Sequence, residues 1–255
     1  CFGDDWISIG IFTACIVFPV SILLEGSLTK IERSRIFVIY IIAFFVIFFW
    51  AAYEQAGASL TLFAAEQTDR FVLGWEVPAS WIQSFNPFFV VILAAIMPGI
   101  WGFLNKRGAE PASPTKQAIG LLLLSLGYLV ICFGVKDTQP GVKVSLIWLT
   151  GLYFIHTVGE LCLSPIGLSM VNKLTPLRFA SLMMGIWYLS MSTANKFAGT
   201  LSGLYPEDGK VKTLLGFRIE TMFDFFMVFV IMSGVASLIL FLLSKKLQKM
   251  MHGVE

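Results

Sequence analysis

The chain has 255 residues, of which 57% are hydrophobic and only 13% are charged, about half the charged fraction of an average soluble protein. This composition excludes a soluble or disordered chain and predicts an integral, multi-pass membrane protein. The formal net charge of +2 is too small to indicate a nucleic-acid partner, so the positions of the basic residues matter more than their sum.

The cysteines and histidines do not form a metal or redox motif. Cys15, Cys132 and Cys162 lie inside apolar runs without CxxC spacing, and the two histidines are far apart, so we expect neither metal ligands nor disulfides. The sequence also has no motif typical of an enzyme nucleophile or a phosphate-binding loop. We therefore expect no catalytic residues and no cofactor. Because the chain begins with Cys1 and has no leader pattern, we expect it to be a piece of a longer polypeptide.

Seven apolar segments follow one another, each about as long as the roughly 20 residues that a membrane-spanning helix needs. In chain order they are Trp6–Leu24, Ile36–Ala65, Trp81–Leu104, Gln117–Val135, Val144–Leu174, Phe179–Leu204 and Met222–Leu243. The connections between them are short, so consecutive helices should be antiparallel neighbours.

Lysine and arginine alternate between the two sets of segment ends. Eleven lie at one set, which includes the start of the second segment and the end of the seventh, and six lie at the other. Because basic loops stay in the cytoplasm, we expect the C-terminus to be cytoplasmic. The second to seventh segments then start and end on the same side. We therefore predict an all-α membrane protein with an accessory helix and linker (1–30) and a six-helix transmembrane bundle (31–255).

The fifth segment carries Glu160 in the middle of an apolar run. A charged side chain at this depth costs at least about 2.5–3.5 kcal/mol, so it usually faces a bundle interior or a water-filled cavity. On a helix, His156, Glu160 and Ser164 share one face. Glu160 is the first site candidate, and His156 is a secondary candidate that could share protons with it. The alternative is an ion pair that only joins two helices.

Glu54 follows the apolar run of the second segment and is expected to be a second buried carboxylate, with Gln55 beside it as a secondary candidate. A carboxylate at this depth exchanges its proton as its surroundings change, which suits a proton-coupled switch. A salt bridge to a helix outside this chain is an alternative of equal weight. Asn86, next to Pro87 in the third segment, is by itself typical of a helix start.

Four motifs, in this order, resemble the proton-dependent oligopeptide transporters, a branch of the major facilitator superfamily: WAAYEQAGASL, FNPFFVVILAAIMPGIW, GELCLSPIGLSMVNKLTP and MMGIWYLSMSTANKFAG. The resemblance extends from about Arg33 to Lys246. It implies that the second to seventh segments are the family's C-terminal six-helix bundle. The first segment would be an accessory helix, and the N-terminal bundle of the same polypeptide would be a partner outside this chain.

The resemblance also implies roles for single residues. Glu160 corresponds to the carboxylate that holds the free amino group of a peptide, Asn86 to the asparagine that joins it, and Glu54 to the acidic position of proton coupling. The positions that correspond to side-chain pockets are Ser164, Trp187 and Ser190.

The expected function is therefore proton-coupled symport of di- and tripeptides by alternating access, with protons as the coupling ion. The expected location is the inner membrane of a bacterium. Three alternatives remain: a transporter of the same fold for another small metabolite such as nitrate, a seven-helix receptor, and a structural interaction subunit.

Overall fold

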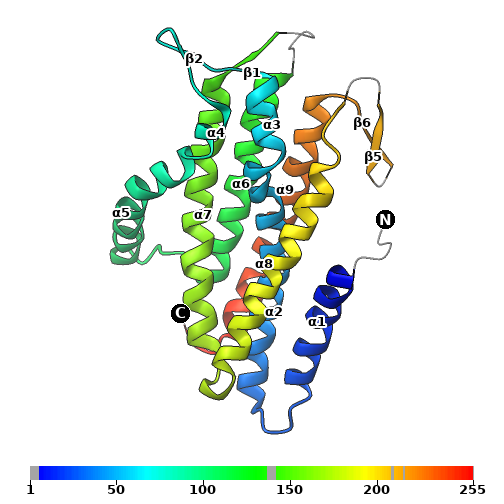
Figure 1. Ribbon diagram of the computed structural model, residues 1–255. Helices are drawn as coiled ribbons and strands as arrows, with labels where there is room; N and C mark the ends of the chain where they lie inside the picture. Colours follow the sequence, from blue (N-terminus) through cyan, green and yellow to red (C-terminus); the bar gives the residue numbers. More distant parts are fainter. Residues whose placement is uncertain (1–5, 137–141, 208–209, 215, 255) are drawn as a thin grey trace.

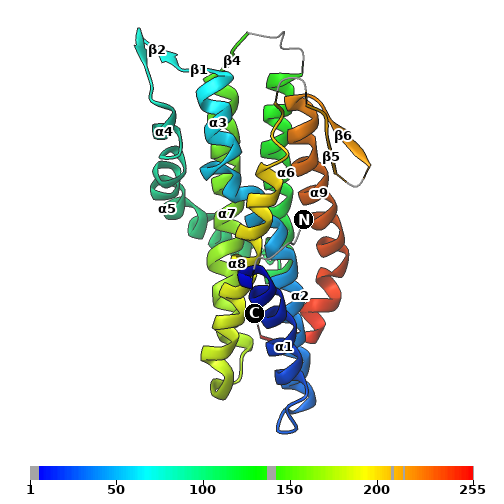
Figure 2. The same cartoon turned by 45° about the vertical axis from the view of Figure 1, so that its right-hand side comes forward.

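The computed structural model describes residues 6–136, 142–207, 210–214 and 216–254. In this part of the chain, long helices form one bundle, and shorter helices and strands lie in the connections between them (Figures 1 and 2). The long helices are α1 (Trp6–Leu23), α2 (Lys30–Tyr53), α5 (Phe85–Lys106), α6 (Ser113–Val135), α7 (Leu146–Leu174), α8 (Ala180–Ser202) and α9 (Met222–Met250). The short helices are η1 (Glu54–Gly57), α3 (Ser59–Glu66), α4 (Ala79–Ile82) and η2 (Leu177–Phe179).

Short two-stranded ribbons, which the sequence analysis did not predict, lie in connections at one end of the bundle (top of Figure 1). The parallel pair is β1 (Thr68–Asp69) with β4 (Val144–Ser145), and the antiparallel pairs are β2 (Phe71–Val72) with β3 (Trp75–Glu76) and β5 (Lys212–Leu214) with β6 (Phe217–Ile219). Because these strands have only two or three residues, they leave the predicted all-α membrane fold intact.

Each predicted apolar segment overlaps one of the long helices, but the second is interrupted. Within it, α2 ends at Tyr53, the tight turn η1 follows, and α3 resumes at Ser59. Ala58, between η1 and α3, has φ −127° and ψ −100°, which is outside the helical range. The helical run is therefore interrupted between Tyr53 and Ser59, and the candidate residues Glu54 and Gln55 lie in this interruption.

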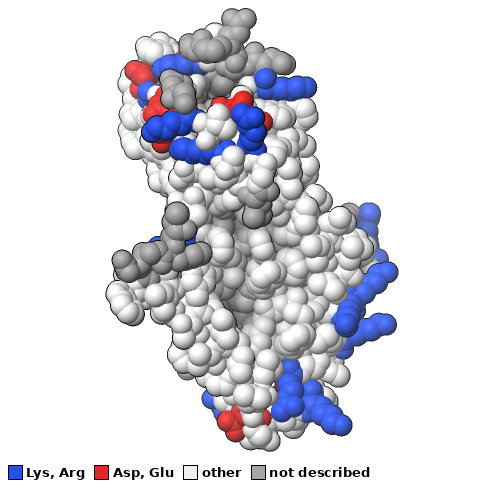
Figure 3. Space-filling view, turned by 90° about the vertical axis from the view of Figure 1, so that its right-hand side faces the viewer, with Lys and Arg blue, Asp and Glu red and all other residues white. Residues whose placement is uncertain are grey.

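Among the described residues, six helical stretches are long and apolar enough to cross a membrane, and they contain every long helix except α8. Polar residues such as Asn195 and Lys196 make α8 less apolar than its neighbours, although its 23 residues are enough to span a bilayer. It packs against α1 and α2 within the bundle. Figure 3 shows charged groups at the top and along the lower right of the molecule, with a largely uncharged surface between them, as is typical of a membrane-spanning bundle. The domain boundary near residue 30 stays a prediction.

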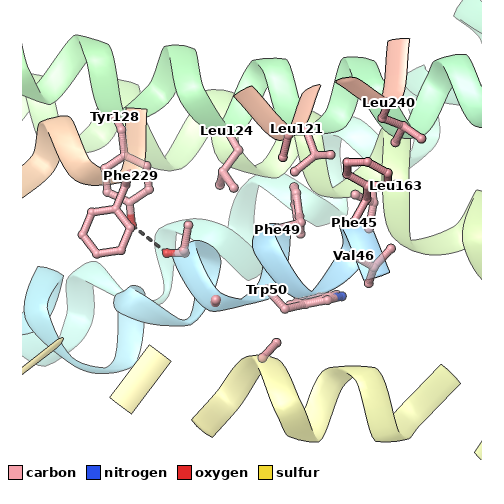
Figure 4. Packing of buried hydrophobic residues seen from close by; sticks show 14 of the residues in the cluster. Phe45, Val46, Phe49, Trp50, Leu121, Leu124, Tyr128, Leu163, Phe229 and Leu240 are labelled. Atoms are coloured by element: carbon pink, nitrogen blue, oxygen red, sulfur yellow. Dashed lines mark hydrogen bonds between the residues drawn. The ribbon is translucent and has the colours of Figure 1, made fainter. Parts of the chain in front are cut away.

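The core between α2, α6 and α9 fixes the last turn of α2 (Figure 4). The fully buried ring of Tyr128 stacks on Phe229, with centroids 4.8 Å apart. Its hydroxyl donates a hydrogen bond of 2.6 Å to the carbonyl of Ala52, in the last turn of α2. This hydrogen bond holds the backbone one residue before Tyr53.

Two facing glycines bring the backbones of α6 and α7 into direct contact. A Cβ on Gly120 would lie 2.8 Å from the carbonyl oxygen of Gly159, and a Cβ on Gly159 would lie 2.9 Å from that of Gly120. Cβ atoms do not approach backbone oxygens so closely, so both positions require glycine. Small residues at a crossing allow this approach in membrane proteins. Since Gly159 precedes Glu160, the contact sets the depth of Glu160 relative to α6.

Candidate functional site

Side chains from α2, α5 and α7 meet at Glu160. Asn86 donates from Nδ2 to Oε2 of Glu160 at 2.9 Å and to Oγ1 of Thr157 at 3.1 Å. The Tyr53 hydroxyl donates to the same Oε2 of Glu160 and accepts a hydrogen bond from Nδ2 of Asn86. We refer to Tyr53, Asn86, Thr157 and Glu160 as the carboxylate cluster. The structure therefore brings Glu160 and Asn86 together, 74 residues apart in sequence.

Aromatic contacts place Asn86 against α7. Asn86 lies in the first turn of α5. The ring of Phe85 meets Tyr153 edge-on at 6.3 Å between centroids, and Phe89 meets Phe154 edge-on at 5.4 Å. These pairs hold the first turns of α5 against the middle of α7, because edge-to-face aromatic pairs add to the energy of buried apolar area. The rest of α5 is largely exposed.

Two oxygens of the carboxylate cluster remain available. Both hydrogen bonds to Glu160 end on Oε2, and Asn86 uses only its Nδ2. Within the described residues, Oε1 of Glu160 and Oδ1 of Asn86 have no hydrogen-bond partner, and neither is among the buried unpaired atoms. An anionic and a neutral acceptor thus lie side by side, which suits an ammonium group with its three donors.

Glu54 lies exposed at the surface of this chain, so the prediction that it is buried is wrong for the structure described here. The apolar run before it belongs to α2, but α2 ends at Tyr53, and Glu54 begins the turn η1, where it is exposed. Among the described residues, no hydrogen bond or ion pair involves its side chain. Its carboxylate is thus available to a group outside this chain.

Gln55, in contrast, is completely buried and fully bonded. Its Nε2 donates to the carbonyls of Ala51 at 3.1 Å and Ala198 at 3.0 Å, and its Oε1 accepts from the Ser59 hydroxyl at 2.6 Å. These bonds join η1 to α8 and to the start of α3. Gln55 therefore holds the interrupted helix together and has no amide group available for a ligand.

His156 is turned away from Glu160. Its Nε2 lies 3.1 Å from the carbonyl of Leu124 on α6, and its ring packs on Tyr128 with centroids 4.8 Å apart. The absence of a side chain at Gly127 makes room for the ring. No hydrogen bond joins His156 to Glu160 among the described residues, so the predicted polar stripe is only partly formed.

Trp187 and Ser190 have contacts within the bundle. Trp187 is buried against Gly167 of α7, where a Cβ would lie 2.6 Å from the indole ring. The Ser190 hydroxyl donates to the carbonyl of Trp187 at 2.6 Å. In the described chain, neither side chain is bonded to Glu160. Ser164, one helical turn after Glu160, is half-buried.

The sequence analysis missed two members of the carboxylate cluster. Tyr53 directly precedes Glu54 in the motif WAAYEQAGASL, and Thr157 lies three residues before Glu160 on the same helical face. Helical spacing could have indicated Thr157. Nothing in the sequence could have indicated Tyr53, because its contact with Glu160 depends on the packing of α2 against α7.

A groove of about 870 Å³ lies between α5, α6 and α7. Along α7 its lining extends from Leu161 to Leu174, and it includes Lys173 and the ion pair of Lys116 with Glu110. The carboxylate cluster itself does not line this groove. Across the described residues, no group of three or more His, Cys, Asp or Glu side chains could hold a metal ion.

The chain is similar in sequence to proteins that are named as peptide transporters or permeases. The family model described as the POT family matches residues 11–215. The peptide transporter YePEPT of Yersinia enterocolitica is 37% identical over 185 residues, which are 72% of this chain and 36% of that protein. Dipeptide and tripeptide permease A of Escherichia coli is 31% identical over 218 residues, 86% of this chain and 43% of the permease.

A solved structure has the same fold. The crystal structure of a mutant peptide transporter POT in complex with alafosfalin matches with a TM-score of 0.85 and 30% identity. The match covers 98% of this chain and 48% of that one. The chain therefore spans less than half the length of the relatives and of the solved structure described here.

Proposed function

The chain belongs to the POT family, and on that premise we propose that it is the C-terminal half of a proton-coupled symporter for di- and tripeptides. Its partner is the N-terminal bundle of the same polypeptide, and the substrate binds between the two halves. Relatives named as peptide transporters support this assignment. Transporter sites of this kind lie near the middle of the membrane, and the two halves move around them to give alternating access.

The single observation that carries the proposal is the pairing of Glu160 with Asn86. All di- and tripeptides with a free N-terminus carry an ammonium group, whatever their side chains. Oε1 of Glu160 and Oδ1 of Asn86 can accept hydrogen bonds from it, and a hydrogen bond to a charged group contributes about 1.5–3 kcal/mol. The site thus recognises the part that all such peptides share, which permits broad specificity. Ser164, Trp187 and Ser190 are proposed to line the neighbouring side-chain pockets.

Glu54 is proposed to be the proton-coupling carboxylate. It is exposed on this half and has no partner among the described residues, so it is available to a basic group of the other half. It directly follows Tyr53, whose hydroxyl is bonded to Glu160. A change at Glu54 therefore acts on a backbone that also positions the carboxylate cluster. Protons are the coupling ion, and the proposal requires no metal or organic cofactor.

We place the protein in the inner membrane of a bacterium with its C-terminus in the cytoplasm. The end of α9 carries Lys245, Lys246 and Lys249, and the adjoining start of α2 carries Arg33 and Arg35. The two ends are bonded to each other, since Arg35 donates to the carbonyl of Met251 at 3.1 Å. Basic residues at this end and mixed charges at the other favour this orientation.

The test is peptide uptake by the full-length protein in proteoliposomes with an inward proton gradient. We expect uptake of Ala-Ala, little uptake of N-acetyl-Ala-Ala, and a loss of Ala-Ala uptake of about 100-fold in Glu160→Gln, because the charge-assisted bond to the ammonium is lost. This substitution keeps the size of the side chain, so the thermal unfolding temperature should change little. Equal uptake of free and acetylated peptide by the parent would refute the role of Glu160. Uptake of nitrate without peptide uptake would favour a transporter of another metabolite.

A further inference from the structure

The Tyr53 hydroxyl is the one group of the carboxylate cluster that contacts both functional partners. It donates to Oε2 of Glu160 and accepts from Nδ2 of Asn86, so its single donor and one of its acceptor sites are both in use. Tyr53 lies on α2, whereas Asn86 lies on α5 and Glu160 on α7. The hydroxyl therefore completes a connection among three helices that meet at one carboxylate.

The ring that carries this hydroxyl is held firmly by its surroundings. It stacks on Phe49 at 5.4 Å between centroids with an interplanar angle of 19°, and Trp50 meets it edge-on at 5.3 Å. The ring of His156 lies 6.2 Å away on the side of α7. The bond from Tyr128 to the carbonyl of Ala52 fixes the backbone just before it. The direction of the hydroxyl is thus set by packing and does not depend on the presence of Glu160.

The hydrogen bonds are distributed unequally over the two oxygens of Glu160. Both donors, Tyr53 and Asn86, bind Oε2, and none of the described residues donates to Oε1. A carboxylate that is held by only one of its oxygens has its rotation fixed and presents the other oxygen in a defined direction. The two donors also stabilise the negative charge of Glu160 before any substrate arrives.

From this geometry we propose that Tyr53 is a positioning residue: by holding Oε2 of Glu160 it directs Oε1 toward the amino group of the peptide. The inference rests on the proposed function, because it assumes that Glu160 binds this amino group. It assigns to the tyrosine hydroxyl, and not to the aromatic ring, part of the selectivity for substrates with a free amine. A phenylalanine at this position keeps the ring packing and loses the positioning.

The experiment compares Tyr53→Phe with the matched control Tyr40→Phe in the full-length protein. Tyr40 is also on α2, but its hydroxyl lies 3.7 Å from the sulfur of Met183, outside the carboxylate cluster. We expect Tyr53→Phe to weaken Ala-Ala binding and to raise its KM by roughly tenfold, the effect of losing one hydrogen bond to a charged group. The maximal rate at saturating peptide should stay within about twofold. Tyr40→Phe should match the parent, because of these two tyrosines only Tyr53 has its hydroxyl bonded to Glu160.

A double-mutant cycle with Glu160→Gln separates positioning from a general structural effect. If Tyr53 acts through the Glu160 carboxylate, Tyr53→Phe should change Ala-Ala binding by less than about twofold in the Glu160→Gln background, measured at millimolar peptide. Additive losses in the double variant, or equal losses in Tyr53→Phe and Tyr40→Phe, would overturn the inference. If Glu160→Gln alone leaves peptide binding unchanged, the proposed function itself fails. If Glu160→Gln weakens binding and Tyr53→Phe does not, only the role of Tyr53 fails.

Discussion

The seam between α6 and α9 and the carboxylate cluster both contain polar side chains in a membrane-spanning bundle, but they use them differently. In the seam, Ser125 donates to the carbonyl of Val230 at 2.8 Å and Ser237 donates to that of Ala118 at 2.8 Å. Each hydroxyl thus donates its hydrogen bond to a backbone carbonyl of the neighbouring helix. In the carboxylate cluster, side chains bond to one another, and no described residue bonds to Oε1 of Glu160 or Oδ1 of Asn86.

Polar residues in apolar helices thus have two different roles in this protein. Hydroxyls that donate to a neighbouring backbone join helices and contribute modestly, about 0.6 kcal/mol on average. Acceptors that remain open beside a charged group are available to a ligand. The unused hydrogen-bonding capacity of a residue therefore indicates function better than its polarity does. Substitutions in the two regions should accordingly change different quantities.

The largest effect on stability is expected at the contact of α6 with α7. Gly120→Ala places a Cβ 2.8 Å from a backbone oxygen, so the helices must move apart, at a cost of about 1–3 kcal/mol in unfolding free energy. Gly199→Ala on α8 is the matched control, since a Cβ there meets nothing within 4 Å. Thermal unfolding in detergent measures both variants. Equal unfolding temperatures for the two would contradict the direct backbone contact.

An intermediate effect, on binding and not on stability, is expected from Asn86→Ala. It removes one of the two donors to Oε2 of Glu160 and the neutral acceptor Oδ1, so the Kd for Ala-Ala should rise about tenfold. Asn105→Ala, at the exposed far end of the same helix, should leave the Kd unchanged. Binding measured by isothermal titration, together with thermal unfolding, checks the prediction. A large drop in unfolding temperature with an unchanged Kd would contradict the binding role and show that Asn86, like the serines of the seam, only joins helices.

The smallest effect is expected in the seam. Ser125→Ala removes a single bond between helices and should lower the unfolding free energy by about 0.6 kcal/mol, with no change in the KM for peptides. Ser192→Ala serves as control, because the Ser192 hydroxyl is exposed and, within the described part of the chain, bonds only to the carbonyl of Tyr188 on its own helix. A change in the KM for peptides in Ser125→Ala would contradict the prediction that the seam affects stability alone.

Hydropathy and spacing predicted the long helices well, because each needs a long apolar run. They could not predict the break after α2, because the run continues from Ile36 to Ala65 while the helix is interrupted near Ala58. For the same reason Glu54 was expected to be buried, although its exposure depends on where α2 ends. The two- and three-residue strands are too short to show the alternation typical of strands.

The candidate site was partly predictable. The depth of Glu160 in its apolar run indicated a functional carboxylate, but its pairing with Asn86 came from the family resemblance, because spacing cannot relate residues on different helices. The direction of His156 toward Leu124 depends on the space that Gly127 leaves. Such effects of packing between helices are not visible in the sequence of one helix.

The glycine pair also bears on how the protein can move. With backbone against backbone at Gly120 and Gly159, α6 and α7 pack closely along their crossing. We therefore expect a displacement of Glu160 across the membrane to carry α6 along with it. If Glu160 binds the peptide amine as proposed, it moves as part of a two-helix unit, and the flexibility needed for alternating access comes from other parts of the protein.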